Sequence, residues 1–161
     1  MTDDEKLTLR EFHRKMGAKT NGGVWGVLDN ANPSEAELED ALEMAYTSRY
    51  HWKQVGTLTN DVRAIYMISR VFSHMKKGES AVNYASVMLD LAKKAERADK
   101  DNWKDFDMPF VYEAMAKAQA AAGNKDECKK FAKMSQDLID KLADKQDREI
   151  CQGELDKLEC D

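Results

Sequence analysis

The chain has 161 residues, 42% of them hydrophobic and 34% charged, which is the composition of one globular domain and excludes a disordered chain. Its formal net charge is −5, from 30 acidic and 25 basic residues, which argues against a broad nucleic-acid-binding surface. Only two prolines and eight glycines interrupt residues that are mostly good helix formers, so we expect an all-α fold.

Two or three helices are predicted in the N-terminal third of the chain. Gly22 and Gly23 follow the first apolar helical stretch. The sequence fits either one long helix or two shorter ones there, because a glycine costs only about 1 kcal/mol in a helix interior. The next helix has a clearer beginning, since Ser34 and Glu37 have the spacing of a capping box. Gly56 is expected to end that helix.

Five further helices are predicted in the rest of the chain. Short turns at Gly78 and Gly123 connect the helices of two pairs, and short turns between helices of this length indicate antiparallel hairpins. One hairpin is expected at residues 57–98 and a second at residues 108–142. A C-terminal capping helix is expected at residues 143–161.

The two hairpins share a pattern of small and large residues. Each first helix has a small residue midway, Ser69 or Ala116, and each second helix opens on another, Ala81 or Cys128. Through these positions the stretch 61–142 resembles the tetratricopeptide-repeat (TPR) family, in which small residues let neighbouring helices approach. The distance between the two copies is longer than the ~34 residues of the regular repeat.

The resemblance implies a single domain, residues 1–161, in which antiparallel helical hairpins stack as a short TPR-like right-handed superhelix of about six to seven helices. Residues 1–56 would be its N-terminal helices. The chain is also similar to an uncharacterised group of bacterial TPR-like proteins, and that resemblance brings no function with it. The similar positions are His51–Trp52, Val55–Thr57, Asp105, Asp107 and Tyr112–Ala114.

In the TPR family the first helix of each pair lines a groove that holds an extended peptide. Carried onto this chain, the groove positions are Arg63, Tyr66, Met67, Arg70 and His74 in the third helix and Phe110, Glu113 and Lys117 in the fifth. Independently of the family, four basic residues lie within an arc of about 60° on the third helix: Arg63, Arg70, His74 and Lys77. Such a stripe fits an acidic peptide, unless Glu113 and Asp107 neutralise it within the protein.

These features favour a non-catalytic interaction module that binds a protein or peptide segment without a cofactor, nucleic acid or membrane. The alternatives are an enzyme of unrecognised type with His51, Glu113 and Arg63 in one cleft, or a structural homo-oligomer such as a homodimer. Two further candidates lie outside the stripe: His51 could form an acid–base pair with Glu113 or Asp107, and Trp52 is expected to be a core residue.

The remaining motifs argue for a cytoplasmic protein without a metal site. No signal peptide is expected, and no apolar stretch approaches the ~20 residues of a membrane span. The acidic stretch 99–107 lacks the turn glycine of a calcium loop and has Trp103 at a ligand position. Cys128 and Cys151 are predicted to be small core residues, and Cys160 an exposed free thiol.

Overall fold

The computed structural model describes residues 6–161, and the regular structure of that part of the chain is entirely helical. It comprises seven helices: α1 (Leu9–Leu28), α2 (Glu35–Val55), α3 (Leu58–His74), α4 (Gly78–Ala98), α5 (Asp107–Ala121), α6 (Lys125–Ile139) and α7 (Lys145–Leu155). The predicted all-α fold of about six to seven helices is therefore confirmed. The first five residues of the predicted 1–56 region lie outside the described part.

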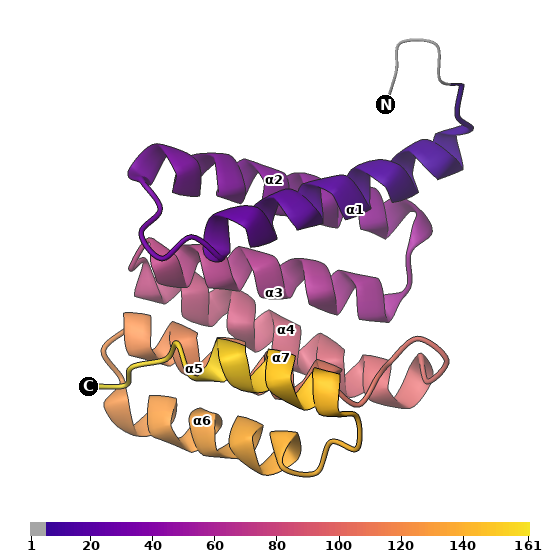
Figure 1. The fold of residues 1–161 in the computed structure, drawn as a ribbon. Coiled ribbons are helices and arrows are strands. Elements are labelled where there is room, and N and C mark those ends of the chain that lie inside the picture. The colour runs from indigo at the N-terminus through magenta and orange to yellow at the C-terminus, as the bar shows by residue number, and fades with distance from the viewer. Residues whose placement is uncertain (1–5) are drawn as a thin grey trace.

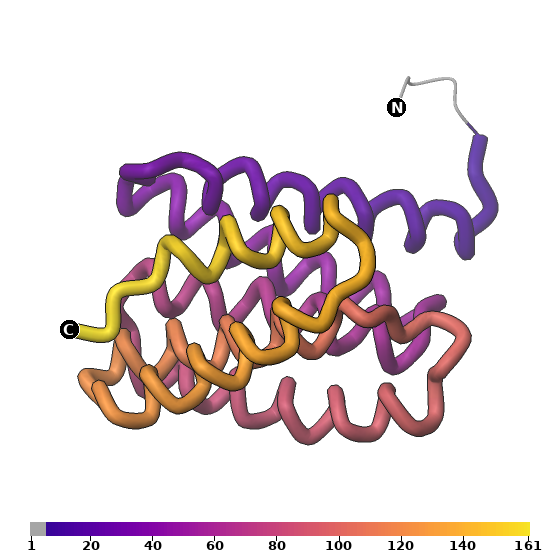
Figure 2. The backbone as a smooth tube through the Cα atoms, turned by 60° about the horizontal axis from the view of Figure 1, so that its bottom comes forward, coloured from indigo at the N-terminus to yellow at the C-terminus, as the bar shows by residue number. Residues whose placement is uncertain are grey.

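The helices pair in chain order as three hairpins, α1 with α2, α3 with α4, and α5 with α6. Figure 1 shows the three pairs stacked one beneath another. Contacts also join α1 to α3 and α3 to α5, so the first helices of the pairs form one layer. The last helix, α7, packs against α5 and α6, and in the view of Figure 2 it runs between α1 and α6.

The first helix is continuous through Gly22 and Gly23 from Leu9 to Leu28. It begins at a capping box in which the Thr8 side chain and the Glu11 side chain each accept a hydrogen bond from the other residue's backbone. The sequence alone did not decide between one long helix and two shorter ones. The structure has one long helix, which packs along α2.

Two hairpin turns show why the chain reverses where it does. Lys76 (φ 58°) and Gly123 (φ 80°) both adopt the left-handed conformation directly after a first helix. Gly78, the first residue of α4, lies against the end of α5, where a Cβ atom would come within 2.7 Å of the Ala121 carbonyl oxygen. The absence of a side chain at Gly78 therefore allows the second and third hairpins to stack closely.

The small residues shared by the two hairpins are all fully buried: Ser69, Ala81, Ala116 and Cys128 have exposed fractions of 0%. Ser69 also donates a hydrogen bond from Oγ to the Ala81 carbonyl, 3.0 Å away. One core cluster extends over α1 to α6, and a smaller one joins α6 to α7 through Ile139, Leu142, Cys151 and Leu155.

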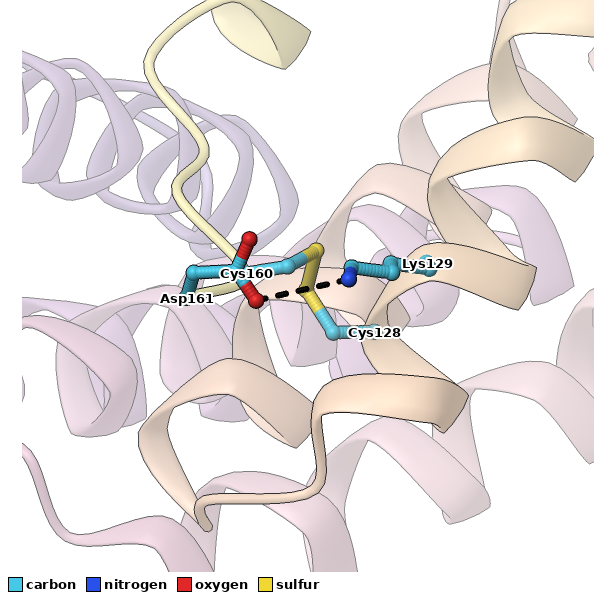
Figure 3. The surroundings of a disulfide bond; sticks show 4 residues. All are labelled: Cys128, Lys129, Cys160 and Asp161. Atoms are coloured by element: carbon cyan, nitrogen blue, oxygen red, sulfur yellow. Dashed lines mark ion pairs between the residues drawn. A yellow bond between two sulfur atoms is a disulfide. The ribbon is translucent and has the colours of Figure 1, made fainter.

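The prediction for Cys160 is wrong, because Cys160 forms a disulfide with Cys128 at the start of α6 (Figure 3). The two Cα atoms are 5.7 Å apart, and the bonded residues are 32 positions apart in the sequence. Cys128 and Cys151 are buried, as predicted. The path of the C-terminal segment back to α6 brings the two sulfur atoms together, and no spacing motif indicates it. No helix in the described residues is long and apolar enough to cross a membrane.

Candidate functional site

Five polar side chains from three helices meet in the interior and form what we call the buried charge cluster: Tyr66 and Arg70 of α3, Glu113 and Lys117 of α5, and Glu154 of α7. Arg70 is fully buried, and its guanidinium lies 3.3 Å from Glu113 and 3.1 Å from Glu154. Lys117 lies 3.1 Å from Glu113 and donates a hydrogen bond to the Glu154 backbone carbonyl at 2.8 Å. The Tyr66 hydroxyl donates to Glu113 at 2.5 Å and accepts from Arg70.

The charges in this cluster balance each other only when α7 is in place. Burial disfavours the charge of Arg70, but Glu113 and Glu154 outweigh it and raise the pKa of the guanidinium above its ordinary value. Burial lowers the pKa of Lys117, and Glu113 offsets part of that effect. For Glu154, burial is outweighed by the hydrogen bond from Lys157 and by the neighbouring cations, so its pKa is lowered. Glu113 and Glu154 are therefore the two carboxylates that balance the buried charges of Arg70 and Lys117.

Arg63, at the other end of the predicted stripe, is held by Asp107. Its Nε and Nη2 atoms lie 2.8 and 2.9 Å from the two carboxylate oxygens, which is a bidentate pair. Asp107 also accepts a hydrogen bond from the Lys104 backbone N–H. The Asp107 side chain is 5% exposed and that of Arg63 is 41% exposed. Both arginines of the stripe are thus paired within the protein.

A cavity of about 250 Å³ opens between α1, α3 and α5, and we call it the aromatic pocket. The rings of Trp25, Tyr66 and Phe110 line it and contact one another, with centroids 5.7 to 6.5 Å apart. Arg63 and Asp107 also line it. Five of its lining residues were candidates from the sequence: Arg63, Tyr66, Met67, Asp107 and Phe110. The contributions of α1 were not, because the helical period of α1 does not show which side faces α3.

A second cavity, of about 530 Å³, lies at the C-terminal end of α3, and we call it the basic cavity. Arg70, His74, Lys117 and Lys157 all line it. Burial, together with the charges of Arg70, Lys117 and Lys157, lowers the pKa of His74 to about 4. Tyr66 lines the aromatic pocket and its partner Arg70 lines the basic cavity, so the buried charge cluster lies between the two.

The other predicted site residues lie elsewhere. His51 Nδ1 is 2.8 Å from Nδ1 of His13 on α1, and burial together with the charge of His13 lowers the pKa of His51. Trp52 is half-buried, and its ring packs against Gly17 of α1. Thus His51, Glu113 and Arg63 contact three different sets of partners, which are His13, the buried charge cluster and Asp107. Among the described residues, no group of three or more His, Cys, Asp and Glu is placed to hold a metal ion.

Comparison with known protein families, with curated proteins and with solved structures gives no match. The class that the fold and the cavities define is a stack of helical hairpins with two cavities along one layer of first helices.

Proposed function

We propose that this protein is a non-catalytic interaction module that binds a segment of another protein and takes one of its apolar side chains into the aromatic pocket. The observation that carries the proposal is the volume and lining of that pocket. At about 250 Å³ it lies below the ~300–1,000 Å³ of typical small-molecule sites but holds one large side chain. Aromatic walls are typical of the pockets that hold the anchor residues of protein interfaces.

The edge of the pocket supplies polar groups that are held in position before a partner arrives. Asp107 fixes the Arg63 guanidinium through two hydrogen bonds, while 41% of the Arg63 side chain stays exposed. A side chain that is already ordered loses less conformational entropy on binding. Arg63 is therefore suited to donate a hydrogen bond to a backbone carbonyl of the bound segment.

We further propose a TPR-like superhelix and, in place of the cytoplasmic location expected from the sequence, a location that is not permanently reducing. The stacked hairpins and the similar turns at Lys76 and Gly123 support the first. The disulfide between Cys128 and Cys160 argues against a permanently reducing location, since disulfides are rare and mostly regulatory in the cytosol of mesophiles.

The test is a selection of random linear peptides displayed on phage against the intact protein, followed by affinity measurement on two variants. Asn21 lines the pocket from α1, so the larger ring of Asn21→Phe reduces the space in it. Lys19→Phe adds the same ring at an exposed position of the same helix and is the matched control. We expect the selected peptides to contain an apolar anchor residue. Lys19→Phe should bind them as tightly as the wild-type protein does, and Asn21→Phe should bind them about tenfold or more weakly. Selection without enrichment, or equal binding by both variants, would contradict the proposal.

A further inference from the structure

The C-terminal segment crosses the layer of first helices and ends bonded to α6. Its helix packs against α5 and α6, and Glu154 reaches Arg70 on α3. Beyond the helix, Lys157 lies 3.8 Å from Asp29 at the end of α1, and Leu158 packs against the main core. Figure 3 shows the last two residues beside the start of α6, where Cys160 is bonded to Cys128. Residues 145–161 therefore act as a strap across the layer.

The strap reaches the part of α3 between the two cavities through the Glu154 side chain. Between Arg63 in the aromatic pocket and His74 in the basic cavity, α3 advances about 16 Å. Glu154 sits in the middle of this distance, at Arg70 and Lys117. With the strap lifted, two cations would face solvent with one carboxylate, Glu113, between them. The uncovered surface would be a continuous groove with a positive centre.

The strap is held more by its contacts than by its own helical stability. An isolated helix shorter than ~12–15 residues is marginal in water, and α7 has 11 residues, including Gly153 in its interior. Its buried side chains are Cys151, Glu154 and Leu155. Apart from its backbone connection to α6, the strap is tethered covalently by the disulfide between Cys128 and Cys160. Cys128 is fully buried, whereas Cys160 is partly exposed, so Cys160 is the more accessible of the two bonded residues.

We infer that residues 145–161 are a built-in competitor for the partner, and that reduction of the Cys128–Cys160 disulfide lets an acidic helical segment of a partner protein replace the strap at Arg70 and Lys117. The inference rests on the proposed function, because it concerns the same layer of helices. It adds the chemistry of the partner: a helix with a glutamate at the position of Glu154, followed by an aliphatic residue such as Leu155.

The reductant is a dithiol, either a dithiol protein or a small-molecule equivalent. One of its thiolates attacks the Cys160 sulfur, and Cys128 leaves as a thiolate that takes up a proton. The second thiol of the reductant, as its thiolate, then attacks the mixed disulfide and releases the Cys160 thiolate, which is protonated in turn. The protein gains two electrons and two protons, and the dithiol becomes a disulfide.

The probe for this inference is a fluorescent synthetic peptide with the sequence of residues 144–159 and serine in place of Cys151. Its affinity is measured for the oxidised intact protein, for the protein reduced with dithiothreitol, and for Cys160→Ser. We expect the reduced protein and Cys160→Ser to bind it about tenfold or more tightly than the oxidised protein. The reason is that the strap loses its C-terminal tether and stays joined to α6 only through the backbone before α7, so its effective concentration at Arg70 and Lys117 falls. The same peptide with Glu154→Gln is the matched control and should bind about tenfold more weakly. Dithiothreitol should leave the affinity of Cys160→Ser unchanged.

Hydrogen exchange on the wild-type protein gives a second readout that needs no variant. Reduction should speed exchange in residues 145–155 by about tenfold or more and leave α3 to α6 protected. Equal peptide binding in both redox states, unchanged exchange in α7, or a reduced protein that is dimeric by light scattering would overturn the inference. If the selected display peptides bind the aromatic pocket equally well in both redox states, the proposed function stands and this inference fails. If no peptide binds in either state, the proposed function fails as well.

Discussion

At the scale of single residues, the interior places Arg70 and Lys117 beside two carboxylates, Glu113 and Glu154. Removing buried charges from water costs several kcal/mol per ion, and the ion pairs offset this cost only with good geometry. Such a cluster contributes little net stability as a whole. It becomes strongly unfavourable when one member is lost, because the remaining charge has no counterion.

The first prediction concerns Glu154→Gln, which keeps the shape of the side chain and removes its charge. Glu154 is 10% exposed, so Arg70 and Lys117 would keep only Glu113 as a counterion. We expect the free energy of unfolding to fall by about 2–3 kcal/mol, measured by urea denaturation. Asp137→Asn is the control, because Asp137 pairs with Lys133 on the surface of α6 and should change stability by less than about 0.5 kcal/mol. Equal effects of the two variants would refute the role of Glu154.

The second prediction is a loss of stability in mild acid that comes from His74. Burial, Arg70, Lys117 and Lys157 lower the pKa of His74 to about 4, whereas a histidine in the unfolded chain has a pKa of about 6.5. The unfolded chain therefore takes up the proton first. The contribution of His74 is present above pH 6.5 and is lost as the pH falls toward 4.

If the whole pKa difference of His74 contributed, the free energy of unfolding would fall by about 2 kcal/mol at pH 5. We expect a decrease of about 1 kcal/mol, because the His74 ring is still partly exposed to solvent. Urea denaturation at pH 7 and pH 5 should show a smaller decrease for His74→Gln than for wild type. The pKa of His51 is also lowered, so His51→Gln separates the second contribution of the same sign. A decrease that is the same in wild type and His74→Gln would show that His74 is not the source.

At the scale of the elements, the glycines of α1 have two different roles. A Cβ atom at Gly17 would lie 2.8 Å from the indole Nε1 of Trp52 on α2, and Ser48 donates a hydrogen bond to the Gly17 carbonyl at 2.9 Å. At Gly22, by contrast, no described atom beyond its chain neighbours and the backbone of its own helix turn lies within 4 Å of such a Cβ. Gly17 therefore permits the close packing of α1 on α2, whereas Gly22 only lowers helix stability.

The third prediction follows from this difference and compares the same substitution at two positions. Gly22→Ala should raise the free energy of unfolding by about 0.5–1 kcal/mol through helix propensity. Gly17→Ala gains the same propensity but forces the Trp52 ring to move, so we expect a net loss of about 1–2 kcal/mol. Thermal denaturation of the two variants measures both values. If both variants are stabilised, the contact between Gly17 and Trp52 does not constrain the packing.

The positions of most helices and turns can be predicted from the local sequence, but the contacts between the helices cannot. The Ser34 capping box and the turn at Gly123 are local signals, and the structure has both where they were predicted. The continuity of α1 at Gly22 and Gly23 was undecided because it depends on contacts with α2, which the sequence of α1 does not contain. The register of α1 against α3, which brings Trp25 into the aromatic pocket, is undetermined for the same reason.

At the scale of the whole molecule, the helical period correctly grouped Arg63 and Arg70 on one side of α3, beside residues of α5. The predicted stripe was wrong for Lys77, which lies beyond the end of α3 at His74 and precedes α4. The helical period could not show that α7 returns over that side. In the sequence, Glu154 cannot be distinguished from the many charged residues that lie on the surface. Its burial depends on a contact with Arg70, which is 84 positions away. The sequence therefore did not predict the long-range contact by which the C-terminal segment returns to α3.

The disulfide between Cys128 and Cys160 also determines how the molecule would carry mechanical load. A force applied at Asp161 passes through the sulfur–sulfur bond directly into the start of α6 and bypasses α7. The two cysteines are 32 positions apart, and the chain between them, roughly 110 Å when extended, stays out of the load path while the bond is intact. After reduction the same force would peel α7 from its end first. The oxidised molecule is therefore short and stiff under tension at this end, and the reduced one is extensible.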